Sequence, residues 1–152
     1  MNSPYVTTEV LEQARVFFED RGSYGCEGTA MIAAGPDRVG RRLVIPEQRA
    51  GQVPSCWVEV TYQGKLQLAV ALGRDETYVA RIHSHPAEAF HSATDDKNPG
   101  LTNHGALSIV VPFFGLGLRR GLDTCAVYRL GSDGWTHLDA GSTRAAVLAV
   151  QE

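Results

Sequence analysis

The chain has 152 residues, about the length of one domain, so residues 1–152 are expected to form a single domain with its own core. Its composition, 43% hydrophobic and 20% charged, excludes a disordered, collagen-like or coiled-coil protein, and its net charge of −3 provides no basic surface for nucleic acid. The longest apolar stretch, Ala106 to Leu118, contains Pro112 and is shorter than the roughly 20 residues of a membrane span, so no membrane segment is expected.

The three cysteines, Cys26, Cys56 and Cys125, are odd in number and widely spaced, and they form no Cys-x-x-Cys pair. This pattern argues against a disulfide framework and against a thiolate zinc site. The first residues, Met1 to Pro4, lack the basic region and apolar core of a secretory signal. We therefore expect a cytoplasmic protein.

The first predicted element is a helix over Thr8–Arg21, where apolar residues recur at helical spacing. Thr8 can cap its start and Gly22 can close its end. Further along the chain, short apolar or alternating runs predict strands. These runs are Thr29–Ala34, Arg42–Ile45, Trp57–Tyr62, Thr77–His83, Ala106–Phe114, Thr124–Leu130 and Trp135–Leu138.

Two more helices are predicted, over Lys65–Leu72 and Thr143–Val150. Helices thus occur early, in the middle and late, with several strands between them. This order predicts an α/β (α+β) fold, in which a mixed, mostly antiparallel sheet is flanked by helices.

The densest chemical signal is the segment Arg81-Ile82-His83-Ser84-His85-Pro86, followed by Ser92-x-x-Asp95. Side chains two apart on a strand point to the same face, so His83 and His85 can clamp one zinc ion. Pro86 has no backbone donor and ends the strand there. A loop that swings back can supply Asp95 as a third ligand. Three protein ligands plus water describe a catalytic zinc site.

Hydrolysis at such a zinc also needs a general base and a donor to the oxyanion. Among the carboxylates, Glu27 is the predicted base, because glycines on both sides favour a close backbone approach, and Glu59 is the alternative. Ser92 lies one helical turn before Asp95 and is the predicted oxyanion donor. A serine followed by an acidic residue three positions later is also typical of a helix start.

These residues resemble the signature of the JAMM (MPN+) metallopeptidase family: an upstream Glu, then H-[ST]-H-P, then S-x-x-D. The resemblance covers about residues 8–140 and implies a JAB/MPN-like domain with cytidine-deaminase-like layering. It implies that His83, His85 and Asp95 bind Zn²⁺, that Glu27 is the general base and that Ser92 stabilises the oxyanion. Five residues separate Pro86 from Ser92, one fewer than in the commonest family pattern, which leaves Asp96 as an alternative ligand.

The resemblance further implies an isopeptidase that removes a ubiquitin-like protein from a lysine, or processes its precursor, by hydrolysing the amide after its C-terminal tail. The expected partners are that ubiquitin-like substrate and the activating and carrier (E1/E2-like) enzymes of the same operon, including antiviral operons. Two alternatives stay open: a JAMM peptidase that acts on a sulfur-carrier protein adduct, and a non-catalytic MPN scaffold module.

Overall fold

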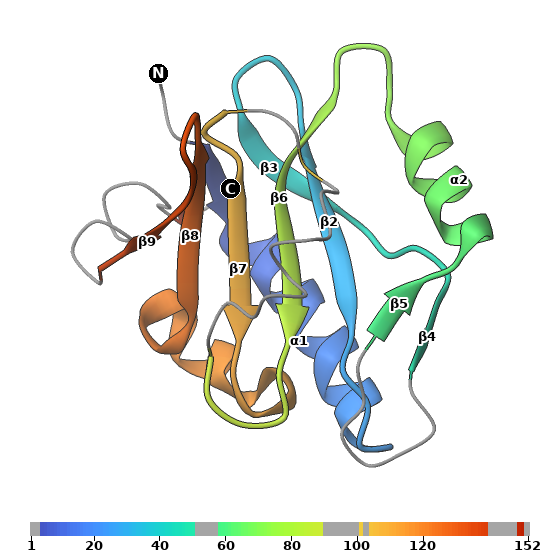
Figure 1. Ribbon diagram of the computed structural model, residues 1–152, viewed down its shortest axis with the longest axis vertical. Helices are drawn as coiled ribbons and strands as arrows, with labels where there is room; N and C mark the ends of the chain where they lie inside the picture. The colour runs from blue at the N-terminus through green and yellow to red at the C-terminus, as the bar shows by residue number, and fades with distance from the viewer. Residues whose placement is uncertain (1–3, 51–57, 90–100, 102–103, 140–148, 151–152) are drawn as a thin grey trace.

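The computed structural model describes residues 4–50, 58–89, 101, 104–139 and 149–150 (Figure 1). Strands make up most of the molecule, with two α-helices and an irregular 3-10 segment, η1. In chain order the elements are β1 (Tyr5–Thr7), α1 (Thr8–Gly22), β2 (Thr29–Ala34), β3 (Val39–Val44), β4 (Gln48–Ala50), β5 (Val58–Val60), α2 (Tyr62–Ala71), β6 (Thr77–Ser84), β7 (Leu107–Val111), η1 (Phe113–Thr124), β8 (Ala126–Gly131), β9 (Gly134–Leu138) and β10 (Ala149–Val150).

One eight-stranded sheet organises the fold, in the order β10-β1-β3-β2-β6-β7-β8-β9. Four neighbouring pairs are antiparallel and three are parallel, including the central pair of β6 and β7. A second sheet pairs β4 with β5, beside α2 in Figure 1. The expectation of a mixed, mostly antiparallel sheet with helices is therefore confirmed.

Helix α1 covers one face of the sheet and crosses behind the strands in Figure 1. It begins where Thr7, one residue before the predicted cap, accepts a hydrogen bond from the Val10 amide (3.1 Å). Its apolar side, which includes Val10 and Phe18, packs into a core with Ile32 and Ile82. Full burial of a large apolar side chain contributes about 1.5–3 kcal/mol, so this face holds the helix on the sheet.

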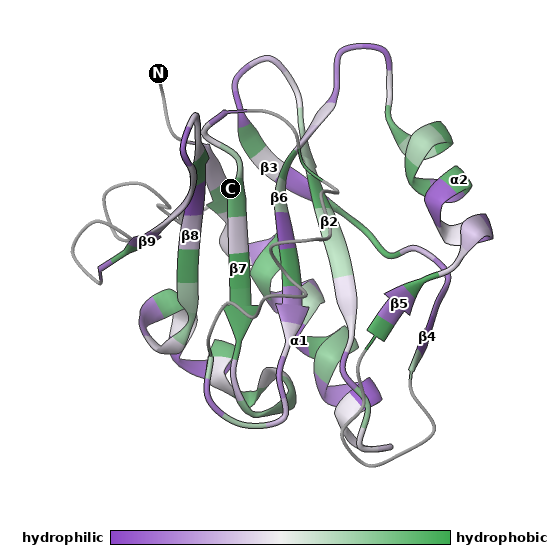
Figure 2. Ribbon diagram, viewed as in Figure 1, coloured by the Kyte–Doolittle hydropathy of each residue, from purple (hydrophilic) through white to green (hydrophobic). Residues whose placement is uncertain are grey.

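The opposite face of the sheet has its own smaller cluster, in which Met31 packs near Leu68 of α2 and Trp135 of β9. Strand β6 is thus buried on both sides. Ile82 belongs to the core beneath α1, so Arg81 and His83 point to the other face by strand alternation. In Figure 2, purple and green segments follow one another along β6, so the strand carries both hydrophilic and hydrophobic residues.

Two sequence-based predictions are wrong in part. The predicted strand Ala106–Phe114 ends at Val111, because Phe113 and Phe114 adopt positive φ angles of 56° and 52° and begin η1. The predicted terminal helix Thr143–Val150 is contradicted at Ala149–Val150, which form β10 by pairing with β1; its other residues lie outside the described ones.

Other boundaries shift by a few residues: α2 begins at Tyr62, before the predicted Lys65, and Trp57 lies outside the described residues. None of the helices in the described ranges is long and apolar enough to cross a membrane.

Candidate metal centre

His83 and His85 lie side by side where β6 ends, with ring centroids 5.1 Å apart and ring planes at 55°. The two residues are 5% and 7% exposed. Two imidazoles on one tetrahedral zinc, with Zn–N bonds of about 2.0–2.1 Å, have ring centres roughly 5 Å apart. The measured separation therefore fits a pair of histidines that share one metal ion.

The backbone on both sides of His85 is anchored to the end of β7. The His85 amide donates to the carbonyl of Val111 (2.9 Å), and its carbonyl accepts from the Phe114 amide (2.8 Å). Two residues after His85, the carbonyl of Ala87 accepts a hydrogen bond from the Phe113 amide (2.9 Å). Phe113 and Phe114 have left-handed φ angles, which are uncommon for bulky residues. In this conformation both of their amides point toward the segment that follows His85. The loop after the histidines is thereby fixed to the sheet.

The start of β2 lies against the end of β6. In the antiparallel ladder of β2 and β6, Thr29 pairs with His83. The next residues in the same register are bonded as well, since the Ser84 amide donates to the Gly28 carbonyl (3.0 Å). Glu27, which is half-buried, directly precedes Gly28 at this end of the strand pair. Arg21 of α1 holds this position by donating from Nε to the Glu27 carbonyl (2.6 Å).

The start of β2 tolerates little change because it is enclosed on several sides. A Cβ atom on Gly28 would lie 2.9 Å from side-chain atoms of both Phe17 and Arg21, so a larger residue would have to displace these side chains of α1. Across the strand, the side-chain amide of Gln48 pairs with both the amide and the carbonyl of Thr29 (2.8 and 2.9 Å). Glu27 is therefore attached to a strand end that is held on both sides.

Within the described residues, no group of three or more His, Cys, Asp or Glu side chains could hold a metal ion. Among these residues, Glu27 therefore does not form a three-ligand set with the two histidines. Ser92, Asp95 and the alternative ligand Asp96 lie outside the described residues. Their predicted roles stay predictions.

Glu59, the alternative base, lies on β5 in the separate two-stranded sheet. It is exposed, and its carboxylate accepts from Arg49 of β4 at 3.1 Å. A carboxylate already paired at the surface of another sheet is a poor candidate for proton transfer at His83 and His85. Glu27 stays the predicted base.

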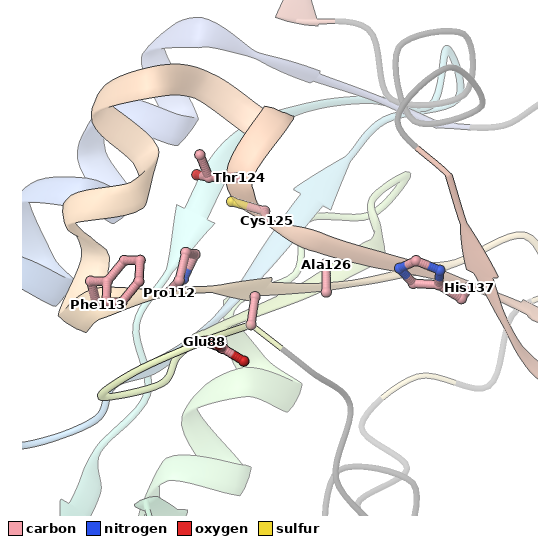
Figure 3. A pocket seen from close by; sticks show the side chains of 8 residues that line it. Glu88, Pro112, Phe113, Thr124, Cys125, Ala126 and His137 are labelled. Carbon is pink, nitrogen blue, oxygen red and sulfur yellow. The ribbon is translucent and has the colours of Figure 1, made fainter.

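A cavity of about 260 Å³ lies between the segment at Glu88 and the start of β8 (Figure 3). Its floor includes Ala126, which pairs with Val110 of β7, and Val110 pairs in turn with His83. Its wall continues along the segment that follows His85. The lining residues are Glu88, Ala89, Pro112, Phe113, Thr124, Cys125, Ala126 and His137. The cavity is smaller than a drug-sized ligand needs, and it suits one residue of an extended chain.

Two lining side chains, Glu88 and His137, were missed by sequence reasoning. They lie far apart in the chain and belong to no motif, so no signal in the sequence could have joined them. Cys125 is also in the wall, and burial raises the pKa of its thiol to about 12. This cysteine is a neutral thiol near neutral pH and lacks the thiolate that a nucleophile needs.

Arg81 is a further buried polar group on the same face of β6 as His83. It is 7% exposed, its Nη2 donates to Oγ of Ser108 (3.3 Å), and its guanidinium lies 5.7 Å from the ring centroid of Trp135. Arg81 begins the histidine segment in the sequence, but its burial could not be predicted there because it depends on contacts with β7 and β9. The face that carries the histidines is therefore polar at its centre.

Comparison with known proteins gives a short sequence match and whole-chain structural matches. No family model matches the chain. A probable metalloprotease, y4jG of Sinorhizobium fredii, is 54% identical over 41 residues, which are 27% of this chain and 25% of that protein. The match thus spans about a quarter of the relative.

Three solved structures share the fold over most of the chain. Protein DSY2949 of Desulfitobacterium hafniense has a TM-score of 0.61 at 16% identity, covering 97% of this chain and 93% of that one. The JAB1/MPN domain protein AF2198 of Archaeoglobus fulgidus has a TM-score of 0.53 at 11% identity, covering 91% and 98%. A protein of Salinibacter ruber has a TM-score of 0.52 at 22% identity, covering 89% and 88%.

The fold is that of the JAB1/MPN domain, as the sequence motif led us to expect. The fold shared with AF2198 and the short match to a probable metalloprotease agree with the resemblance to the JAMM/MPN family stated from the motif.

Proposed function

We propose that this chain is a zinc-dependent peptidase of the JAMM type. The observation that carries the proposal is the pair of buried imidazoles at the end of β6, with ring centroids 5.1 Å apart; Gly28, the residue after Glu27, is hydrogen-bonded to Ser84 between them. The metalloprotease name of the partial relative and the fold shared with the JAB1/MPN domain protein AF2198 support a metal-dependent peptidase. Zinc is the metal we propose, because borderline-soft imidazole ligands suit it.

His83 and His85 hold the metal in this proposal, with Asp95 as the third ligand. Zinc, when bound, makes water acidic near neutral pH and polarises a carbonyl. Glu27 accepts the proton of the attacking water and passes it to the departing amine nitrogen. Ser92 donates a hydrogen bond to the oxyanion that develops on the scissile carbonyl.

The proposed substrate is the amide bond after the C-terminal tail of a ubiquitin-like protein, on a conjugated lysine or in a precursor. Such a tail can bind as an extended chain. The cavity lined by Glu88 and His137 is of a size for one residue next to the scissile bond. In this proposal the enzyme works in the cytoplasm with activating and carrier enzymes of a conjugation pathway. A sulfur-carrier adduct is the alternative substrate, and its amide hydrolysis needs the same residues.

The test compares wild type with three variants for bound zinc, by mass spectrometry, and for cleavage of a ubiquitin-like fusion. Glu27→Gln should keep zinc and lose turnover by roughly 10²–10⁴-fold, because it removes proton transfer and no ligand. His85→Ala should lose both zinc and turnover. Glu59→Gln is the matched control, since this carboxylate lies on the other sheet, and it should keep both.

Normal turnover in Glu27→Gln would refute the proposed base. A zinc content near zero in wild type would instead favour the non-catalytic scaffold. Cleavage of a carrier–cysteine adduct in preference to the fusion would move the substrate to the sulfur-carrier class.

A further inference from the structure

Ser84, between the two histidines, is a polar side chain in an apolar place. It is 0% exposed. Strand alternation turns it away from the histidines, to the face of Ile82, and the register pairs it with Val111. Both neighbours belong to the core beneath α1. Burial of a hydroxyl there is unfavourable unless the hydroxyl is hydrogen-bonded, so its partner indicates its role.

That partner is the backbone of Gly28. The Gly28 amide donates to Oγ of Ser84 at 2.9 Å, while the Ser84 amide donates to the Gly28 carbonyl at 3.0 Å. In a regular antiparallel pair, two residues exchange both bonds through their backbones. Here the hydroxyl of Ser84 takes the place of its carbonyl as the acceptor. The side chain therefore extends the pairing of β2 and β6 beyond the end of the regular ladder.

The two bonded residues flank the proposed catalytic groups, because Gly28 follows Glu27 and Ser84 precedes His85. We propose that Ser84 is a positioning residue that holds the backbone of Glu27 beside the histidine pair. The inference rests on the proposed function, in which Glu27 is the base. A displacement of about 1 Å in a reacting group can reduce turnover about 10²-fold.

The two histidines are held by other contacts, so the Ser84 hydroxyl acts on the base and not on them. His83 is paired with Val110 in the ladder, and His85 is bonded to Val111 and Phe114. Loss of the hydroxyl leaves these bonds in place. It removes the acceptor of the Gly28 amide, and the chain before β2 can then move away from His85.

The experiment compares Ser84→Thr with Ser84→Val, which have nearly the same shape and differ in the hydroxyl. Ser84→Thr should keep the wild-type kcat. Ser84→Val should lose kcat by roughly 10–100-fold, with zinc affinity and KM unchanged. Ser84→Ala provides a second variant without a hydroxyl. Ser108→Ala is the control, because Ser108 is equally buried on the adjacent strand β7 and contacts Arg81.

A second readout does not depend on activity. Backbone amide exchange, followed by NMR, should show Gly28 protected in wild type and in Ser84→Thr, and exchanging faster in Ser84→Val and Ser84→Ala.

Three results would overturn the inference: a wild-type kcat in both variants that lack the hydroxyl, unchanged protection of the Gly28 amide in them, or a loss of zinc that parallels the loss of kcat. Absence of turnover in zinc-loaded wild type would refute the proposed function itself, and with it any catalytic effect of this contact. An active wild type with equally active Ser84→Val and Ser84→Ala variants would refute the positioning role alone.

Discussion

Gly115→Ala tests the contact between α1 and η1 that supports the loop after His85. Gly115 has a φ of +94°, where an L-residue costs about 1–2 kcal/mol. An added Cβ would also lie 2.6 Å from Cβ of Phe18 and 3.2 Å from the amide nitrogen of Glu19. Overpacking of this kind costs about 1–3 kcal/mol. The sum, about 2–5 kcal/mol, is a large part of the stability of a domain.

Thermal unfolding followed by circular dichroism measures this cost. At about 2–4 °C per kcal/mol for a chain of this size, Gly115→Ala should lower Tm by roughly 4–20 °C. Gly121→Ala is the matched control for the backbone, since Gly121 has a φ of +71° and nothing within 4 Å of its Cβ position. Gly35→Ala, which has neither strain nor contact, should be close to wild type. A Gly115→Ala variant no less stable than Gly121→Ala would refute the proposed steric conflict.

Three further predictions concern acid stability, thiol reactivity and the oxyanion donor. Hydrogen bonds from Arg119 and Arg15 lower the pKa of Glu19 from its ordinary 4.5 to about 2, so its contribution to stability is present above pH 4.5 and is lost as the pH falls toward 2. The free energy of unfolding in urea should therefore be lower for Glu19→Gln than for wild type at pH 6, and the two values should converge near pH 2. The difference at pH 6 should be modest because Arg119 is exposed, and a difference that does not change with pH would contradict this prediction. Because burial raises the pKa of Cys125 to about 12, iodoacetamide should label it slowly at pH 8 and leave turnover intact; rapid labelling would contradict the burial argument. Ser92→Ala should keep zinc and lose roughly 10²–10³-fold in turnover, and an unchanged kcat would remove it as the oxyanion donor.

The parts of the fold that follow from local physics could be predicted from the sequence. Helical spacing of apolar residues located α1, and alternation located β6 and the shared side of His83 and His85. Pro86 predicted the end of this strand, and β6 ends at Ser84, two residues before it. These features depend on neighbours in the chain, which a sequence displays directly.

Features that depend on distant contacts could not be predicted. Phe113 and Phe114 continue an apolar run and resemble the end of a strand. Their left-handed conformation is set by bonds to the carbonyls of Ala87 and His85. The glycines beside Glu27 suggested a close approach, and at Gly28 the residues approached belong to α1. The cavity at Glu88 is formed by three segments that are far apart in the sequence, so no single segment predicts it.

The pairing of β1 with β10 has a consequence for how the molecule is made. Val6 pairs with Ala149, so one neighbour of β1 comes from the opposite end of the sequence. Closing so long a loop is entropically slow, and on the ribosome that neighbour does not yet exist while the rest of the sheet is emerging. Until synthesis reaches it, β1 has β3 alone beside it and presents an open edge to other nascent chains. When β10 has paired with β1, the edge of the sheet is a strand of only two residues, which offers other chains little backbone to pair with.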